Sequence, residues 1–275
     1  MNDTIKDYIY RFMSFESFVD MVQRKALAFF LHDKWEDPFE SFILKTMKLK
    51  EGRQEILRIL KEMTQDLAME NFEKILKFYT VVFSQSWTEC KESDALWRIY
   101  SHNNMSIRTE IRTTNILNLF QEPTRVTAHK MQYSNTISIK SQLKDIIDDD
   151  KIKIEKIFLT KRKEFSHEKE IRLVTLDLLN YSKQTPFQRD IMKELFEEGE
   201  IEEEYYKTYT QFNSSRKISD VKYVSYGDIT EFISSVMLHP LAPNWCDETV
   251  RTFCKNNNLN YIGKSKLYQF NYDGP

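Results

Sequence analysis

The chain has 275 residues and a formal net charge of −2, with 41% hydrophobic, 13% aromatic and 30% charged residues. This composition can fill the core of one large domain or two small ones, and the balanced charge excludes a global attraction to nucleic acid or to anionic membranes. Only five Gly and six Pro exclude a disordered chain and a repeat-rich β-sandwich.

Three cysteines, Cys90, Cys246 and Cys254, are widely separated. Their odd number and spacing indicate neither a disulfide framework nor a zinc knuckle. The first residues, MNDTIKDYIY, lack the basic and then apolar pattern of a signal peptide, and no stretch reaches the ~18 apolar residues of a membrane span. We therefore expect a cytoplasmic protein without a membrane partner.

The first elements are two apolar strands around a short helix. Tyr8–Phe12 is aromatic and predicts a strand with Arg11 at its centre. Ser14 is a typical N-cap for a helix that ends near Lys25, and Ala26–Leu31 predicts the second strand. Arg11 is either a surface residue or a half-buried guanidinium that binds an anion.

The segment Asp37-Pro38-Phe39-Glu40 predicts a helix start. Its aspartate would cap the helix, its proline would occupy the first turn, and its glutamate would reach back to the cap. After a break at Gly52, Arg53–Phe78 predicts a long amphipathic helix, or two helices that meet near Asn71. We expect this helix to cover one face of a sheet.

The central unit of the chain is expected between Tyr79 and Arg112. Tyr79–Phe83 predicts a buried strand, and Ser84-Gln85-Ser86-Trp87 predicts a polar turn after it. A short helix would begin at Ser93 or Asp94, and Met105–Arg112 alternates as a strand does. Because loops on a rigid frame commonly carry sites, we expect a site in these connections.

The next predicted elements are a helix, a strand, another helix and a basic stretch, at Thr114–Phe120, Arg125–Tyr133, Ser141–Asp150 and Lys151–Lys163. The basic stretch is either a solvated face or a contact for a polyanion such as nucleic acid.

Phe165–Val174 is expected to end as a strand. In an extended chain Glu168, Glu170 and Arg172 share one face. Two carboxylates this close repel each other unless a cation or a hydroxyl-bearing ligand lies between them. The three residues therefore form either a structural ion pair or a functional site.

The last third of the chain completes the predicted sheet. Tyr181–Ser215 is read as a helical insert or a partner-docking arm. Further strands are expected at Lys217–Ser225, Ser235–His239, Leu259–Ile262 and Lys266–Phe270, and a helix capped by Asn244 buries Cys246 and Cys254. Together the elements predict a single α+β domain over residues 1–275, with a mixed, mainly antiparallel central sheet flanked by helices.

Several short motifs in order carry a resemblance to a known family. They are YRFMS (10–14), LAFF (27–30), EDPFE (36–40), FSQSW (83–87), ALWRIYSHNNMSIRTEI (95–111), FSHEKEIRLV (165–174) and VMLHPLAPNW (236–245). Together they resemble the widespread prokaryotic domain of unknown function 2971, from about Tyr10 to about Trp245. This resemblance implies a fold neighbourhood rather than an activity.

A second resemblance is more chemical. Arg11, then Phe83-Ser84-Gln85-Ser86, then Glu168-Lys169-Glu170 is similar to the arginine, serine-turn and E-x-E signature of one class of ADP-ribosyltransferases. The resemblance implies an ADP-ribosyltransferase-like fold with NAD as substrate. It implies that Arg11 binds the NAD pyrophosphate and that Ser84 and Ser86 brace the nicotinamide pocket.

The same resemblance assigns the two glutamates. Glu170 would hold the nicotinamide ribose hydroxyl and stabilise an oxocarbenium-like transition state, while Glu168 would orient the acceptor. We add Trp97 and Tyr100, the aromatic residues of the helix after the serine motif, to the candidate NAD-binding residues.

Three hypotheses of function follow. The first is an NAD-consuming transferase, such as a toxin or phage-defence effector that modifies a protein or a nucleic acid; it requires Arg11, Ser84 and Glu170 to meet in one cleft. The second is a non-catalytic binding module that uses Trp87, Trp97 and Tyr100. The third is a metal-dependent nuclease that uses the four carboxylates of Asp37, Glu40, Glu168 and Glu170.

Overall fold

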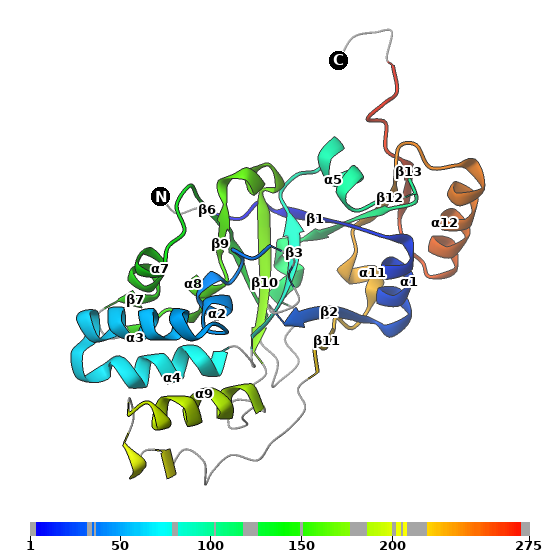
Figure 1. The fold of residues 1–275 in the computed structure, drawn as a ribbon. Coiled ribbons are helices and arrows are strands. Elements are labelled where there is room, and N and C mark those ends of the chain that lie inside the picture. The colour runs from blue at the N-terminus through cyan, green and yellow to red at the C-terminus, as the bar shows by residue number, and fades with distance from the viewer. Residues whose placement is uncertain are drawn as a thin grey trace.

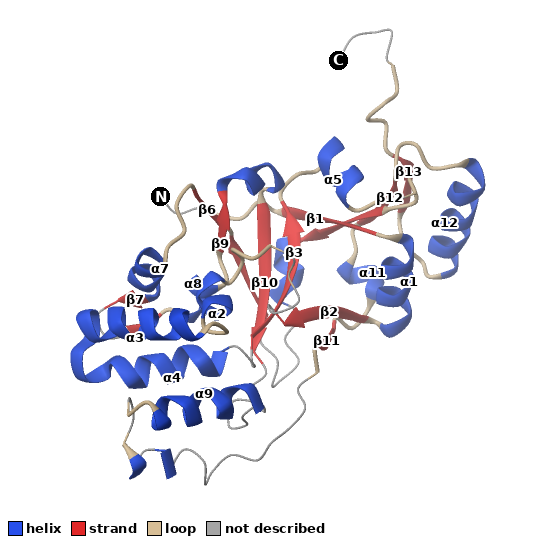
Figure 2. Ribbon diagram, in the orientation of Figure 1, coloured by secondary structure: helices blue, strands red, loops and turns tan. Residues whose placement is uncertain are grey.

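In the part of the chain that the computed structural model describes, a central sheet of nine strands separates two groups of helices (Figures 1 and 2). The structure describes residues 4–31, 35, 37–78, 82–101, 103–117, 126–148, 151–176, 186–199, 202–204, 206–207 and 219–270. Every strand pair of this sheet is antiparallel except the last one along its order. The expected α+β class, with a mainly antiparallel sheet flanked by helices, is confirmed.

The strands of this sheet come from all parts of the chain. They are β1 (Tyr8–Met13), β2 (Ala26–Leu31), β3 (Val82–Thr88), β4 (Ile107–Arg112), β5 (Val126–Lys130), β10 (Glu170–Leu176), β11 (Val221–Ser225), β12 (Ser235–Leu238) and β13 (Tyr261–Lys264). Their order is β11-β2-β3-β1-β4-β12-β13, with β10 paired to β3 and β5 paired to β10. Two small sheets lie outside it: β6 (Gln132–Ser134) with β9 (Thr160–Arg162), and β7 (Ile147–Asp148) with β8 (Lys151–Ile152).

The helices fall into two groups at the two ends of the molecule (Figure 1). One end has α1 (Phe15–Arg24), α11 (Ile229–Phe232) and α12 (Asn244–Asn256). The other has α2 (Phe42–Thr46), α3 (Lys50–Thr64), α4 (Ala68–Phe78), α7 (Ile139–Ile146), α8 (Ile154–Ile157) and α9 (Pro186–Glu197). Short helices α5 (Asp94–Ile99) and α6 (Thr113–Leu117) follow β3 and β4, and 3-10 turns occupy Gln65–Leu67 and Lys163–Glu168.

Two diverging strands, β1 and β2, pair with the same edge of β3. On its other edge β3 pairs along its whole length with β10, from Thr88 with Glu170 to Val82 with Leu176. On the shared edge β2 meets β3 near its start, at Ser84, and β1 meets it near its end. Because β1 and β2 are joined through α1 and spread apart (Figure 1), the middle of this edge lies open.

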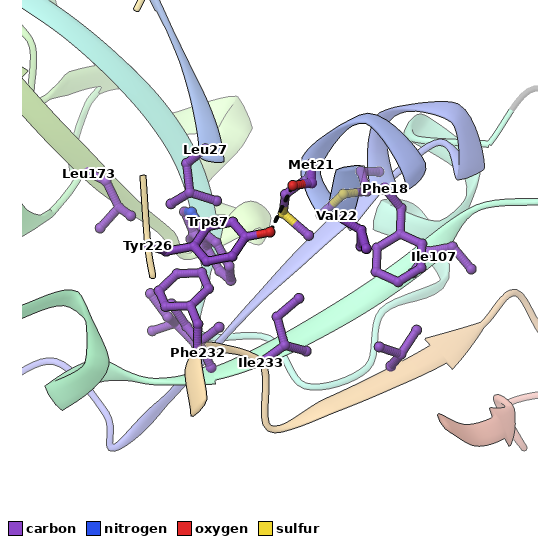
Figure 3. Packing of buried hydrophobic residues seen from close by; sticks show 14 of the residues in the cluster. Phe18, Met21, Val22, Leu27, Trp87, Ile107, Leu173, Tyr226, Phe232 and Ile233 are labelled. Atoms are coloured by element: carbon purple, nitrogen blue, oxygen red, sulfur yellow. Dashed lines mark hydrogen bonds between the residues drawn. The ribbon is translucent and has the colours of Figure 1, made fainter. Parts of the chain in front are cut away.

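Each face of the sheet packs against its own hydrophobic cluster. The first cluster joins the sheet to α1, α11 and α12; in Figure 3, Tyr226 lies between Phe232 and Met21. The Tyr226 hydroxyl donates to the Met21 carbonyl at 2.8 Å, and its ring stacks on Phe232 with centroids 5.0 Å apart. The second cluster joins α2, α3, α4, α7, α8 and α9 to Val82 and Val174, so α9 is packed into it rather than extended from the domain.

Two predicted helix caps are confirmed. Ser14 accepts a hydrogen bond from the Ser17 amide at the start of α1, and Ser93 accepts one from the Leu96 amide at the start of α5. The predicted long helix is two helices, but the break lies at residues 65–67 rather than near Asn71.

Gly52 lies inside α3 and does not break the chain. A Cβ atom at this position would lie 2.2 Å from the Thr46 carbonyl oxygen, so only glycine allows the end of α2 to come this close.

Other local predictions are wrong because tertiary contacts override them. The Ser84–Trp87 segment continues β3 instead of turning, because its backbone is paired to β10. Glu168 belongs to the 3-10 turn before β10, so it does not share a strand with Glu170. Residues 266–270 form no strand. Tyr79 and most of 181–215 lie outside the described residues.

The predicted helix start at Asp37 is also wrong. Asp37 accepts a hydrogen bond from the Phe39 amide in a turn, but α2 begins only at Phe42. Glu40 does not reach back to a cap, because its carboxylate lies in the protein interior among cations.

None of the helices in the described ranges has the length and apolarity needed to cross a membrane.

Candidate functional site

A cleft opens where β1 and β2 separate along β3. Arg11, Phe12, Ser86 and Tyr100 line two adjoining hollows in it. The narrow hollow, about 20 Å³, also contacts Glu168 and Glu170, together with Tyr10, Trp87, Thr88 and Leu96. The wide hollow, about 430 Å³, also contacts Ser84, Gln85, Phe30, Trp35, Ile99, Met13, Ser14 and Ser17. The structure therefore brings Arg11, both serines, Tyr100 and both glutamates to one cleft.

The alternation of β3 explains why this face is polar. Phe83 and Trp87 point into the first hydrophobic cluster, so Ser84 and Ser86 face the opposite side. The register with β10 sets Arg172 beside Ser86 on that side. The helices of the second cluster cover the apolar end of the face, and the cleft lies at its polar end.

Arg11 is a cation of the cleft for which the described part of the chain supplies no hydrogen-bond or ion-pair partner. No described residue accepts a hydrogen bond from its guanidinium or forms an ion pair with it, although it lines both hollows. Loss of solvent around the group lowers the pKa of Arg11 to about 10, against a smaller opposite effect of Tyr100. Arg11 is therefore charged at neutral pH and offers its donors to a ligand.

Glu170 is held by donors on both carboxylate oxygens. Its Oε1 accepts from the Ser86 hydroxyl at 2.6 Å and from Nε and Nη2 of Arg172 at 2.9 and 2.7 Å. Its Oε2 accepts from the Lys161 ammonium at 2.9 Å. Burial is the largest single effect on the pKa of Glu170 and would raise it, but Arg172, Lys161 and Ser86 together outweigh burial and lower the pKa.

Lys161 lies among three carboxylates. Its ammonium contacts Glu40, Glu168 and Glu170 at 2.9, 2.7 and 2.9 Å. Arg172 contacts Glu40 as well, at 3.1 Å. Three carboxylates and two cations thus form one network, here called the charge network, of Glu40, Lys161, Glu168, Glu170 and Arg172.

Aromatic groups and a backbone carbonyl surround the charge network. The Trp35 ring lies 4.1 Å from the Arg172 guanidinium, which also donates to the Phe158 carbonyl at 2.8 Å. The Tyr133 hydroxyl accepts from the Glu170 amide at 2.8 Å, and burial raises the pKa of Tyr133 to about 12. These contacts fix the Glu170 side of the cleft.

Sequence reasoning missed Lys161, Trp35 and Tyr133 as parts of this site, and it grouped Glu40 with Glu168 and Glu170 only in the nuclease hypothesis. Glu40 was assigned to a helix cap and Lys161 to a basic surface. No local sequence pattern marks Trp35 or Tyr133 as a site residue, because their partners in the site, Arg172 and Glu170, lie far along the chain.

Of the aromatic residues predicted for the cleft, Tyr100 lines both hollows and Trp87 lines the narrow one. Tyr100 is 40% exposed at the rim of the cleft, whereas Trp97, which was predicted to line it, lines neither hollow. The Trp97 ring is fully buried, packs edge-on against Phe12 and His239, and donates to Glu92. The Trp87 indole is also buried and donates to Gln85 at 2.8 Å.

The basic stretch 151–163 does not present all its charges to solvent. Lys161 is inside the charge network. Arg162 pairs with Asp37 at 3.1 Å and stacks on Phe39 at 4.8 Å. These two cations are therefore committed to the protein and do not support the predicted nucleic-acid contact.

The four carboxylates of the nuclease hypothesis do not meet as ligands for one ion. Asp37 pairs with Arg162, and the Lys161 ammonium occupies the space that Glu40, Glu168 and Glu170 share. Within the described ranges, no group of three or more His, Cys, Asp or Glu side chains is arranged to hold a metal ion.

In comparisons with known proteins, no family model, no curated protein and no solved structure matches this chain. The resemblances to domain of unknown function 2971 and to ADP-ribosyltransferases therefore stay predictions from the sequence. The function has to be argued from the cleft itself.

Proposed function

We propose that the cleft binds NAD and that the protein transfers the ADP-ribose group of NAD to an acceptor. The observation that carries this proposal is a guanidinium, Arg11, that has no partner among the described residues and lies in one cleft with two serines and two glutamates. A diphosphate suits the fork of donors of an arginine, and carboxylates suit a ribose on which positive charge develops.

The proposed reaction has one bond broken and one formed. The bond between the ribose C1′ and the nicotinamide nitrogen breaks, and its electron pair leaves with the nicotinamide, which becomes neutral. A nucleophilic atom of the acceptor bonds to C1′ and releases its proton to water. Fixed negative charge beside C1′ stabilises the transition state, in which positive charge spreads over the ribose ring.

In this proposal the two hollows bind different parts of NAD. The wide hollow is the larger space and has Arg11 and Tyr100 at its border with the narrow one. A diphosphate at Arg11 leaves the ribose next to it facing Glu168 and Glu170. In this proposal the acceptor is a protein or a nucleic acid. The protein acts as a toxin or phage-defence effector in the cytoplasm, where NAD is available.

The test is incubation of the purified full chain with NAD labelled in the nicotinamide, followed by measurement of released nicotinamide and of NAD affinity by calorimetry. Arg11→Ala is expected to weaken NAD binding by about tenfold or more, since a hydrogen bond to a charged group contributes about 1.5–3 kcal/mol. Arg24→Ala is the control, because Arg24 is exposed and pairs with Asp20 on α1. A wild-type chain that neither binds nor cleaves NAD contradicts the proposal.

A second candidate is a binding module that holds NAD or a related nucleotide without turnover. The observation that favours it is the coordination of Glu170, whose two oxygens are already occupied by Ser86, Arg172 and Lys161. The same assay separates the two functions. NAD binding that depends on Arg11, with no release of nicotinamide over the buffer blank, identifies the binding module.

A further inference from the structure

The two glutamates of the cleft have different access to a ligand. The Glu170 side chain is 2% exposed and the Glu168 side chain is 15% exposed. Both line the narrow hollow with Arg11 and Tyr100. The Glu168 carboxylate is therefore the more accessible of the two to a ligand in the cleft.

Glu170 offers a ligand hydroxyl far less acceptor capacity than Glu168 does. A carboxylate offers about four lone-pair sites. Oε1 is crowded by three donor contacts, one from Ser86 and two from Arg172, while Oε2 accepts from Lys161 and keeps one site within a side chain that is only 2% exposed. Displacing any of them would leave a buried cation or hydroxyl without its partner, which is costly in the protein interior.

Glu168 has one carboxylate oxygen free. Its Oε2 accepts from Lys161 at 2.7 Å, while its Oε1 accepts no hydrogen bond from any described residue. The backbone beneath it is fixed, because the Thr88 hydroxyl donates to the Glu168 carbonyl at 2.5 Å. The left-handed conformation of Lys169, with a φ of 42°, then turns the chain into β10.

We infer that Glu168 is the carboxylate that contacts the ribose, and that Glu170 is a positioning residue. Glu168 Oε1 accepts the ribose hydroxyl and sets negative charge beside C1′; Glu168 itself forms no covalent bond and takes no proton. Glu170 holds Ser86 and Lys161 in place, and Lys161 in turn holds Glu168. These roles reverse those implied by the E-x-E resemblance, and they rest on the proposed NAD site.

The test compares Glu168→Gln and Glu170→Gln with the matched control Glu164→Gln. Glu164 lies on the same 3-10 turn as Glu168, is exposed, and its carboxylate has no ion pair with a described residue. For each variant we measure nicotinamide release, the affinity for ADP-ribose by calorimetry, and the midpoint of thermal unfolding.

Glu168→Gln is expected to lower nicotinamide release by about 100-fold or more, as is usual when one electrostatic stabiliser of a transition state is removed. Its unfolding midpoint should stay near that of the wild type. Glu170→Gln should lower the midpoint clearly, because it leaves Lys161 and Arg172 underpaired. Glu164→Gln should match the wild type in all three measurements.

The inference is overturned if Glu168→Gln keeps wild-type release while a folded Glu170→Gln loses it. If the wild type binds ADP-ribose but releases no nicotinamide, the transferase proposal fails. The inference is then tested by comparing the affinities of the variants for ADP-ribose. ADP-ribose binding weakened by about tenfold in Glu168→Gln alone supports it, and equal affinities overturn it. If the wild type binds neither NAD nor ADP-ribose, both proposals are overturned.

Discussion

Arg11 and Arg53 are two enclosed arginines that differ in their hydrogen-bond partners. Arg53 donates to the Met47 carbonyl at 3.0 Å and to Glu194 at 2.5 Å, and so joins α3 to α9. Arg11 has no such partner among the described residues, and its pKa is lowered to about 10 by desolvation. A cation without a partner reduces stability, so its presence in the cleft points to a ligand.

We expect Arg11→Leu to leave the free energy of unfolding within about 1 kcal/mol of the wild type, or to raise it, because no ion pair is lost. Arg53→Leu is the contrasting variant and should lower stability by about 2 kcal/mol or more, because it leaves Glu194 and two carbonyls without their donor. Urea unfolding followed by circular dichroism measures both. A large loss of stability in Arg11→Leu would show that the guanidinium has a structural partner.

Glu170 gives the stability of the protein a pH dependence with a definite sign. Its pKa in the folded protein is lower than the ordinary value of 4.5, so the unfolded chain binds more protons between the two values. The contribution of Glu170 is fully present above pH 4.5 and is lost as the pH falls through the folded pKa.

We therefore expect the unfolding midpoint of the wild type to fall as the pH decreases below about 4.5, with a shallower slope in Glu170→Gln. Thermal unfolding between neutral pH and the acid limit measures this slope. Glu164→Gln is the control and should keep the wild-type slope. Equal slopes in wild type and Glu170→Gln would mean that Glu170 titrates alike in both states.

At the scale of elements, β3 decides where the cleft lies. Its edge is shared between β2 and β1, which leave the strand in different directions. The Gln85 side chain spans the gap: its amide donates to the Ala28 carbonyl of β2 at 2.8 Å and accepts from the Trp87 indole at 2.8 Å. The Gln85 side chain thus connects β3 to β2 where the backbones of the two strands are not paired.

Gln85→Leu is expected to lower the free energy of unfolding by about 1–3 kcal/mol, because it leaves a partly buried carbonyl and a buried indole N–H without their partner. It should also weaken NAD binding, since β2 carries Phe30 at the wall of the wide hollow. Gln23→Leu on the exposed side of α1 is the control, with an expected change within about 0.5 kcal/mol. Unchanged stability and affinity in Gln85→Leu would contradict a bridging role.

At the scale of the molecule, β3 and β10 connect the two hydrophobic clusters. Val82 and Val174 belong to the cluster with α3 and α4. Their neighbours Phe83 and Leu173 belong to the cluster with α1 and α12. Because alternate residues of the same strands lie in both clusters, neither cluster can lose its packing without disturbing the other.

We expect a single cooperative unfolding transition, with tryptophan fluorescence and far-ultraviolet circular dichroism coinciding. Phe72→Ala should shift the whole transition by about 3–5 kcal/mol, since Phe72 is 0% exposed in the helical cluster. Phe270→Ala is the control, because Phe270 is 81% exposed. Two separate transitions, with only the first shifted by Phe72→Ala, would show independent folding units.

The sequence by itself determined the elements whose signal is local. Aromatic and other apolar runs predicted β1 and β2, and serine caps predicted the starts of α1 and α5. Motif resemblance pointed to Arg11, Ser86 and Glu170, which the fold does bring to one cleft. These features were accessible because caps and periodicity depend on neighbours along the chain.

Only the tertiary structure decided the chemistry of those residues. It placed Lys161 between Glu40 and Glu170, removed Trp97 from the cleft, and extended β3 through the serine motif. The physical reason is that charge neutralisation and strand pairing join residues far apart in the chain. No local pattern says which buried carboxylate keeps a free oxygen, because its donors come from other elements.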